Sequence, residues 1–113
     1  MGVWQKAMSW VENIYAASSD FPKSEQFGMT SQLRRASVSV PANIAEGAER
    51  PGTKEFRQFI GIALGSLAEA ETLVLLSSRL GYLKHDHEVE LLEQGAEIGR
   101  MLHGLNRSLA GKL

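Results

Sequence analysis

The chain has 113 residues, 43% of them hydrophobic and 22% charged, a globular composition with room for a single domain, residues 1–113. Twelve Lys and Arg nearly balance thirteen Asp and Glu, so net charge neither indicates nor excludes a nucleic-acid partner, which needs only a local patch. The absence of cysteine excludes disulfides, thiolate nucleophiles and Cys-ligated metals.

Two helices are predicted before residue 50, separated by a loop rich in Ser, Asp and Pro. Residues 3–18 carry apolar side chains at helical spacing: Trp4, Ala7, Met8, Val11, Ile14 and Tyr15. The second helix is predicted to take Thr30 as its N-cap and to end at Gly47 and the Pro51–Gly52 pair. Its apolar stripe is Leu33, Ala36, Val40 and Ile44.

The third predicted helix starts at Thr53, with Glu55 in its first turn, and ends at Arg79 and Gly81. Its heptad-like seam is Phe56, Ile60, Ala63, Leu67, Ala70, Val74 and Ser77. A second apolar stripe lies beside this seam: Phe59, Leu73, Leu76 and Leu80. Small residues would also let another backbone approach closely: Gly61, Ala63, Gly65, Ser66, Ala68 and Ala70. A helix that is apolar on several sides must be buried on several sides, so we expect a homo-oligomer.

The fourth predicted helix opens at Asp86, with Glu88 and Glu90 in its first turn. Its apolar residues again alternate between steps of four and three: Leu91, Gly95, Ile98, Leu102, Leu105 and Leu109. No strand-like alternation is present. We therefore predict an all-α fold, an antiparallel up-down four-helix bundle.

No segment is predicted to be a secretory signal or a membrane span. The N-terminal MGVWQKAMSWVE has no continuous apolar run. The most apolar stretch, Phe59 to Leu76, contains Glu69 and Glu71 and many small residues. We expect a cytoplasmic protein without a membrane partner.

Motifs for catalysis and metal binding are weak. The segment Gly47–Lys54 has the glycine spacing of a phosphate-binding loop, but its Thr-Lys order is reversed and no strand precedes it, which favours an interhelical turn. His85 and His87, with His103 further on, lack the Glu-x-x-His pairs of bundle metal sites. Ser66 lies inside an apolar helix, not in a nucleophile elbow. We expect no enzyme activity, no cofactor and no metal.

A polar stripe follows the second helix at helical spacing: Gln32, Arg35, Ser39, Asn43, Glu46 and Arg50. Two interpretations stay open, a solvated face with internal hydrogen bonds and ion pairs, or a face that contacts a partner. Pro41 interrupts this helix. It cannot donate to the Ser37 carbonyl, and so predicts a kink.

A local surplus of basic residues surrounds the same region. Residues 22–57 hold six basic and four acidic side chains, whereas residues 58–113 hold five and seven. The candidate phosphate contacts are Arg34, Arg35, Arg50, Lys54 and Arg57. A ring of subunits would repeat and concentrate their potential.

Two runs carry a family resemblance, LRRASVSVPANIAEG from Leu33 to Gly47 and EFRQFIGIALGSLAE from Glu55 to Glu69. They resemble the bacterial four helix bundle protein family, also called the 23S rRNA intervening-sequence protein or S23 family. The opening VWQKAM, the Phe21-Pro22…Glu25 stretch and the LGYL turn at Leu80–Leu83 fit as well.

The resemblance implies an up-down bundle assembled into a homopentamer, and a genomic link to insertions in 23S rRNA genes. A related branch resembles the accessory protein of diversity-generating retroelements, a basic pentamer that binds nucleic acid and a reverse transcriptase. This chain differs from that branch in being slightly acidic.

Two functions follow as expectations. The first is a non-enzymatic homo-oligomer that contacts structured RNA, or DNA, through the five candidate phosphate contacts. The alternative is a protein-interaction scaffold that presents the polar stripe to a protein partner. The two differ in salt dependence, because phosphate contacts release counterions.

Overall fold

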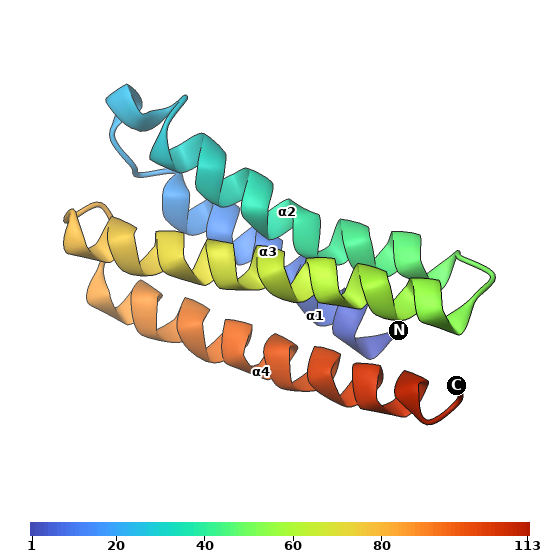
Figure 1. Ribbon diagram of the computed structural model, residues 1–113. Coiled ribbons are helices and arrows are strands. Elements are labelled where there is room, and N and C mark those ends of the chain that lie inside the picture. Colours follow the sequence, from blue (N-terminus) through green and yellow to red (C-terminus); the bar gives the residue numbers. More distant parts are fainter.

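The computed structural model describes residues 1–113 as four α-helices and one short 3-10 turn. The elements are α1 (Gly2–Ser18), η1 (Lys23–Glu25), α2 (Met29–Ala48), α3 (Thr53–Arg79) and α4 (His85–Ala110). Successive helices run in opposite directions. Both termini and the α2–α3 turn therefore lie at one end, and η1 and the α3–α4 turn at the other (Figure 1). The predicted all-α antiparallel bundle is confirmed.

Glu25, not Thr30, caps the start of α2. The helix begins at Met29, whose N–H donates to Glu25 Oε1 at 3.0 Å, and the Tyr82 hydroxyl donates to Glu25 Oε2 at 2.9 Å. Both bonds favour the ionised carboxyl and lower the pKa of Glu25, the Met29 bond more than the Tyr82 bond. Thr30 lies inside the helix and is buried, so its prediction as N-cap is wrong.

α2 continues through Pro41 as a single helix. The proline has no N–H, so the carbonyl of Ser37 loses its usual helical donor. In Figure 1 the axis of α2 changes direction near the middle of the helix, as the internal proline predicts.

α3 ends just before Gly81, as the sequence predicted. Gly81 takes a φ of 80°, in the left-handed region that favours glycine. The Tyr82 N–H donates to the Ser77 carbonyl at 2.9 Å and the Gly81 N–H to the Ser78 carbonyl at 3.0 Å. These two bonds satisfy the last carbonyls of the helix in a Schellman motif.

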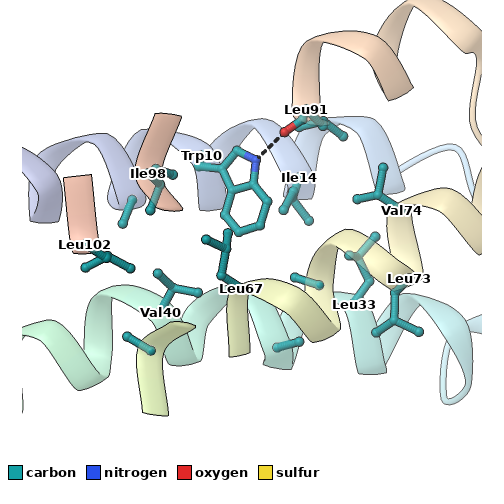
Figure 2. Close-up of a cluster of buried hydrophobic side chains, with 14 of the residues drawn as sticks. Trp10, Ile14, Leu33, Val40, Leu67, Leu73, Val74, Leu91, Ile98 and Leu102 are labelled. Atoms are coloured by element: carbon teal, nitrogen blue, oxygen red, sulfur yellow. Dashed lines mark hydrogen bonds between the residues drawn. The ribbon is translucent and has the colours of Figure 1, made fainter. Parts of the chain in front are cut away.

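The core draws on all four helices and is centred on Trp10 (Figure 2). The indole is fully buried, and its Nε1–H donates to the Leu91 carbonyl of α4 at 3.0 Å. This bond satisfies the one polar atom of the side chain, so the large ring can be buried without an unpaired donor.

The predicted apolar stripe of the first helix is displaced around the helix axis. The structure buries Val3, Ala7, Trp10 and Ile14, whereas Met8 and Tyr15 are exposed. The predicted seams of the other helices are confirmed, with Phe56 and Leu105 only partly buried. In the second stripe of α3, Leu73 is buried, but Leu76 and Leu80 are exposed.

Candidate nucleic-acid interface

Charge is segregated along the long axis of the bundle. The half that contains the termini and the α2–α3 turn, residues 1–9, 39–65 and 98–113, carries seven Lys and Arg against three Glu. The other half, residues 10–38 and 66–97, carries five Lys and Arg against ten Asp and Glu. We call these the basic end and the acidic end. A chain with a net charge of −1 therefore carries an excess of basic side chains at one end.

Three of the predicted phosphate contacts lie at the basic end, Arg50, Lys54 and Arg57. Arg50 pairs with Glu46 at 2.9 Å, and its guanidinium carbon lies 5.0 Å from the centre of the Phe59 ring. Arg57 Nε donates to Asn106 Oδ1 of α4 at 3.0 Å. Lys54 is exposed and has no ion pair, which leaves its ammonium available for an external anion.

The other two predicted contacts lie at the acidic end. Arg34 and Arg35 lie in the first half of α2, roughly 20 Å along the helix from its last residue, Ala48, which precedes Arg50. Arg34 is occupied within the bundle, because its Nε donates to Ser18 Oγ at 2.9 Å and its Nη2 to the Tyr15 carbonyl at 3.2 Å. Arg35 is exposed. The five predicted residues therefore do not form one surface.

Sequence reasoning missed a second group of cations at the basic end: Arg100, Arg107 and Lys112. They lie on the last turns of α4 and in the residues after it, and the two arginines are exposed on that helix. Counting charge along the sequence placed them in an acidic segment. The predicted up-down order of the helices could have identified these residues, because it places the end of α4 beside the start of α3.

The polar stripe of α2 is largely bonded within the bundle. Ser39 Oγ lies 2.8 Å from Ser66 Oγ of α3, and Asn43 Nδ2 donates to the Ser39 carbonyl at 2.8 Å and to its Oγ at 2.9 Å. At the other end of the stripe, a shallow hollow of about 310 Å³ separates α2 from α3. Its lining includes Gln32, Arg35 and Glu69. The exposed parts of the stripe are therefore Gln32 and Arg35 beside this hollow and the Glu46–Arg50 pair at the opposite end.

The Gly47–Lys54 segment is an interhelical turn, as predicted. Gly47 belongs to α2, and a Cβ added there would lie 2.7 Å from the Cβ of Phe59. Because Gly47 has no side chain, α2 can pack closely on α3 at this point. Gly52 is the N-cap residue of α3.

The three histidines are exposed and do not gather with other potential ligands into a metal site. His85 Nδ1 lies 3.4 Å from Glu88 Oε1, and no group of three or more His, Cys, Asp or Glu side chains is placed to hold a metal ion.

The outer face of α3 carries small and apolar residues together with the exposed polar side chains of Gln58, Glu69 and Thr72. Gly61, Gly65 and Ala68 are exposed there, beside Ile62 at 51% and Leu76 at 41% exposure. A Cβ added at Gly61 or Gly65 would meet nothing within 4 Å. The other small residues face inward, because Ala63 and Ala70 are buried and Ser66 contacts Ser39.

By length and composition α3 also qualifies as a candidate membrane span, with a mean hydropathy of 1.7 over its most apolar window, a third of which is buried. A single such helix is weak evidence for a membrane, since a core helix of a bundle passes the same test.

Comparison with known proteins identifies a protein family and a similar solved structure. A family model described as "23S rRNA-intervening sequence protein" matches residues 1–104. The crystal structure of a protein of unknown function from the S23 ribosomal protein family of Bacteroides thetaiotaomicron superposes with a TM-score of 0.83. It is 23% identical in sequence, with 92% of this chain and 97% of that chain covered, a likeness that shows the shared fold. A search of curated proteins finds no match.

Proposed function

The chain belongs to the 23S rRNA-intervening sequence protein family, and from this premise we propose that it is a homo-oligomeric protein that associates with structured RNA through its basic end. The observation that carries the proposal is the segregation of charge, seven basic against three acidic side chains at that end. Phosphate contacts supply most non-specific affinity for nucleic acid, and a concentrated basic surface provides them even when net charge is near zero.

The proposed self-association has two physical arguments behind it. The exposed Gly61, Gly65 and Leu76 on the outer face of α3 have no partner within the bundle. Burying it between subunits would remove apolar surface from water. A closed ring of parallel subunits, such as a pentamer, would also bring several basic ends together and add their potentials.

The test compares two cations on the same helix. Lys54 and Arg79 are both exposed at opposite ends of α3, Lys54 at the basic end and Arg79 at the acidic end. Lys54→Ala is expected to weaken binding to a structured RNA and to lower the slope of log affinity against log salt by roughly one unit per lost contact. Arg79→Ala is expected to leave both unchanged. Equal effects of the two substitutions, or no RNA bound at low salt, would reject the basic end as the RNA contact.

Glu46 gives a second test of the same interface. It holds Arg50 in an ion pair at 2.9 Å and adds negative charge near the basic end. Because the substitution frees Arg50 and removes repulsion of phosphate, Glu46→Ala is expected to tighten RNA binding. A loss of affinity would count against phosphate contact at this position.

The alternative function is a scaffold for another protein, favoured by the open hollow at Gln32, Arg35 and Glu69. Under this alternative, Arg35→Ala and Asn43→Ala weaken a protein complex, while RNA affinity is low and does not respond to Lys54→Ala. In either case we propose a non-enzymatic role without a metal. Purified protein is expected to leave nucleoside triphosphates intact and to contain no stoichiometric metal by elemental analysis.

A further inference from the structure

The most exposed large apolar side chain of the protein is Phe27, in the loop between η1 and α2. It is 90% exposed and lies at the acidic end of the bundle. Single exposed apolar residues are common on protein surfaces and need no explanation by themselves. Phe27 differs from these because the backbone beside it is held in place by several hydrogen bonds.

Glu25 fixes the loop that carries Phe27. The Gly28 N–H donates to the Glu25 carbonyl at 3.0 Å. The Glu25 carboxylate accepts from the Met29 N–H at 3.0 Å and from the Tyr82 hydroxyl at 2.9 Å. The loop is therefore tied both to α2 and to the α3–α4 turn. Because its backbone is already ordered, little conformational entropy would be lost if the Phe27 ring were bound by a partner.

A shallow hollow at the same end of the bundle has the size and the lining to receive an aromatic ring. It lies between the last turns of α1 and the first turns of α4 and measures about 200 Å³, whereas a cavity of about 150 Å³ is sufficient to hold benzene. Half of its lining is apolar and half polar: Ala16, Ala17 and Leu91, and Asn13, His87 and Glu90. Leu91 is buried, whereas His87 and Glu90 are exposed, so the hollow has an apolar floor and a polar rim.

Phe27 and this hollow lie on different sides of the bundle. α2 packs on α1 and α3 but not on α4, and η1 stands out from the bundle on the α2 side (Figure 1). The two features can meet between copies. A ring of parallel subunits is generated by rotation about an axis along the bundle, and this rotation keeps each residue at the same distance along that axis. The loop of one copy therefore meets the acidic end of the next copy, where the hollow lies.

We propose that Phe27 of one copy inserts into the α1–α4 hollow of a neighbouring copy and joins successive subunits head to tail. Charge favours the same contact, because the exposed Lys23 lies near Phe27 in the sequence and the exposed Glu90 lines the hollow. Neither residue has an ion-pair partner within its own chain. The inference rests on the proposed self-association and adds to it a contact distinct from the outer face of α3.

Removal of the ring and filling of the hollow test this contact from its two sides. Phe27→Ala is expected to weaken association at least tenfold in sedimentation equilibrium, since aromatic side chains that fill pockets dominate interface affinity. Ala16→Trp is expected to do the same, because Ala16 is an exposed lining residue and the larger side chain would occupy the hollow. The double variant is expected to associate as strongly as the weaker of the two single variants, since both changes remove one contact.

Leu113→Ala is the matched control. It removes an exposed apolar side chain, 69% accessible, at the opposite end of the chain's long axis, and is expected to leave association unchanged. Unchanged association of Phe27→Ala, or effects of Phe27→Ala and Ala16→Trp that multiply in the double variant, would overturn the proposal. Phe27 and Ala16 are both exposed, so the variants are expected to fold, and circular dichroism checks this.

The cysteine-free sequence allows a geometric test as well. Chains with Phe27→Cys mixed with chains with Ala16→Cys are expected to form disulfides between position 27 of one chain and position 16 of the other on oxidation. Each variant alone is expected to cross-link poorly, because like positions do not meet in a head-to-tail contact. Preferential 27–27 disulfides would indicate a two-fold contact and reject the proposed one.

The mass of the assembly separates this inference from the proposed function. If Phe27→Ala keeps the wild-type mass and still binds RNA through Lys54, the proposed function stands and the contact is wrong. If Phe27→Ala releases single chains while the wild-type assembly binds no RNA, the contact stands and the RNA function is wrong. A wild type of 12.4 kDa at micromolar concentration would reject both.

Discussion

The guanidinium of Arg34 lies 4.5 Å from the centre of the Tyr15 ring and donates to the Tyr15 carbonyl at 3.2 Å. The same side chain donates to Ser18 Oγ at 2.9 Å, so a single arginine of α2 holds the last turn of α1. The guanidinium of Arg34 is occupied by contacts within the bundle. The sequence predicted a phosphate contact at this position, but in the structure Arg34 stabilises the packing of α2 on α1.

Arg34→Ala is expected to destabilise the bundle by about 1–2 kcal/mol, because it removes a cation–π contact and two charged hydrogen bonds at a partly exposed site. Thermal unfolding would record this as a fall of roughly 4 °C per kcal/mol. The neighbouring Arg35→Ala is the matched control, since Arg35 is exposed, and is expected to change stability by no more than about 0.5 kcal/mol. Equal melting temperatures for Arg34→Ala and wild type would contradict the assignment.

Trp10→Phe tests the bond that joins α1 to α4 in the core. The substitution removes the Nε1–H donor of the 3.0 Å bond to the Leu91 carbonyl and leaves a small cavity. An expected loss of about 1–3 kcal/mol follows from the broken hydrogen bond and the missing ring atoms. Urea unfolding measures the change, and an unaltered midpoint would show that the bond contributes little.

The error in helix one shows where prediction from sequence stops. Met8, Tyr15 and Trp10 are all apolar enough for a core, and spacing alone admits two neighbouring phases of the helix. The structure selects the phase that buries Trp10, because α4 offers the Leu91 carbonyl to its indole N–H. That acceptor comes from a residue 81 positions away, which no local pattern contains.

The long helices were predictable for the opposite reason. The α3 seam around Leu67 repeats over many turns, and its ends carry local signals, Glu55 at the start and Gly81 at the stop. The candidate site was predictable only in part. Lys54 was identified because other basic residues lie near it in the sequence. Arg107 is distant in the sequence, and only the antiparallel packing of α3 and α4 brings it to the same end of the bundle.

Gly47→Ala is expected to destabilise the protein even though alanine favours helices. The added Cβ would lie 2.7 Å from the Phe59 Cβ and 3.0 Å from a Phe56 ring carbon. Overpacking of this kind costs about 1–3 kcal/mol, more than the roughly 1 kcal/mol that alanine gains over glycine in a helix. Gly111→Ala, beyond the end of α4, makes the same chemical change without a crowded neighbour, its nearest atom being 3.5 Å away. A melting temperature for Gly47→Ala at or above that of wild type would show that α2 and α3 are not this closely packed.

Glu71 gives the protein a predictable response to pH. Its carboxyl lies against α4, where a Cβ added at Gly95 would be 2.9 Å from Oε2, and partial burial raises the pKa of Glu71 above its ordinary value. The folded state therefore holds the proton more tightly than the unfolded state. Ionised Glu71 costs stability at neutral pH, and this cost disappears as pH falls through the raised pKa.

Glu71→Gln is consequently expected to raise the melting temperature at pH 7, with the advantage vanishing below about pH 4, where both states are protonated in the wild type. Glu69→Gln, two residues earlier and exposed, is expected to show no such pH-dependent gain. A Glu71→Gln variant less stable than wild type at pH 7 would mean that the carboxylate has a favourable partner.

Two acidic substitutions on α3 separate folding from assembly. Leu67 is buried in the core, and Leu67→Asp places an unpaired charge there at a cost of several kcal/mol, comparable to the stability of a small domain. That variant is expected to lose its helical circular dichroism.

Leu76 is 41% exposed on the outer face of the same helix, so Leu76→Asp is expected to keep the fold. If the outer face of α3 joins subunits, Leu76→Asp releases a folded chain of 12.4 kDa in light scattering, whereas the wild type has a multiple of that mass. A wild type that is already 12.4 kDa at micromolar concentration would reject the oligomer, and a Leu76→Asp variant of unchanged assembled mass would move the subunit contact away from this face.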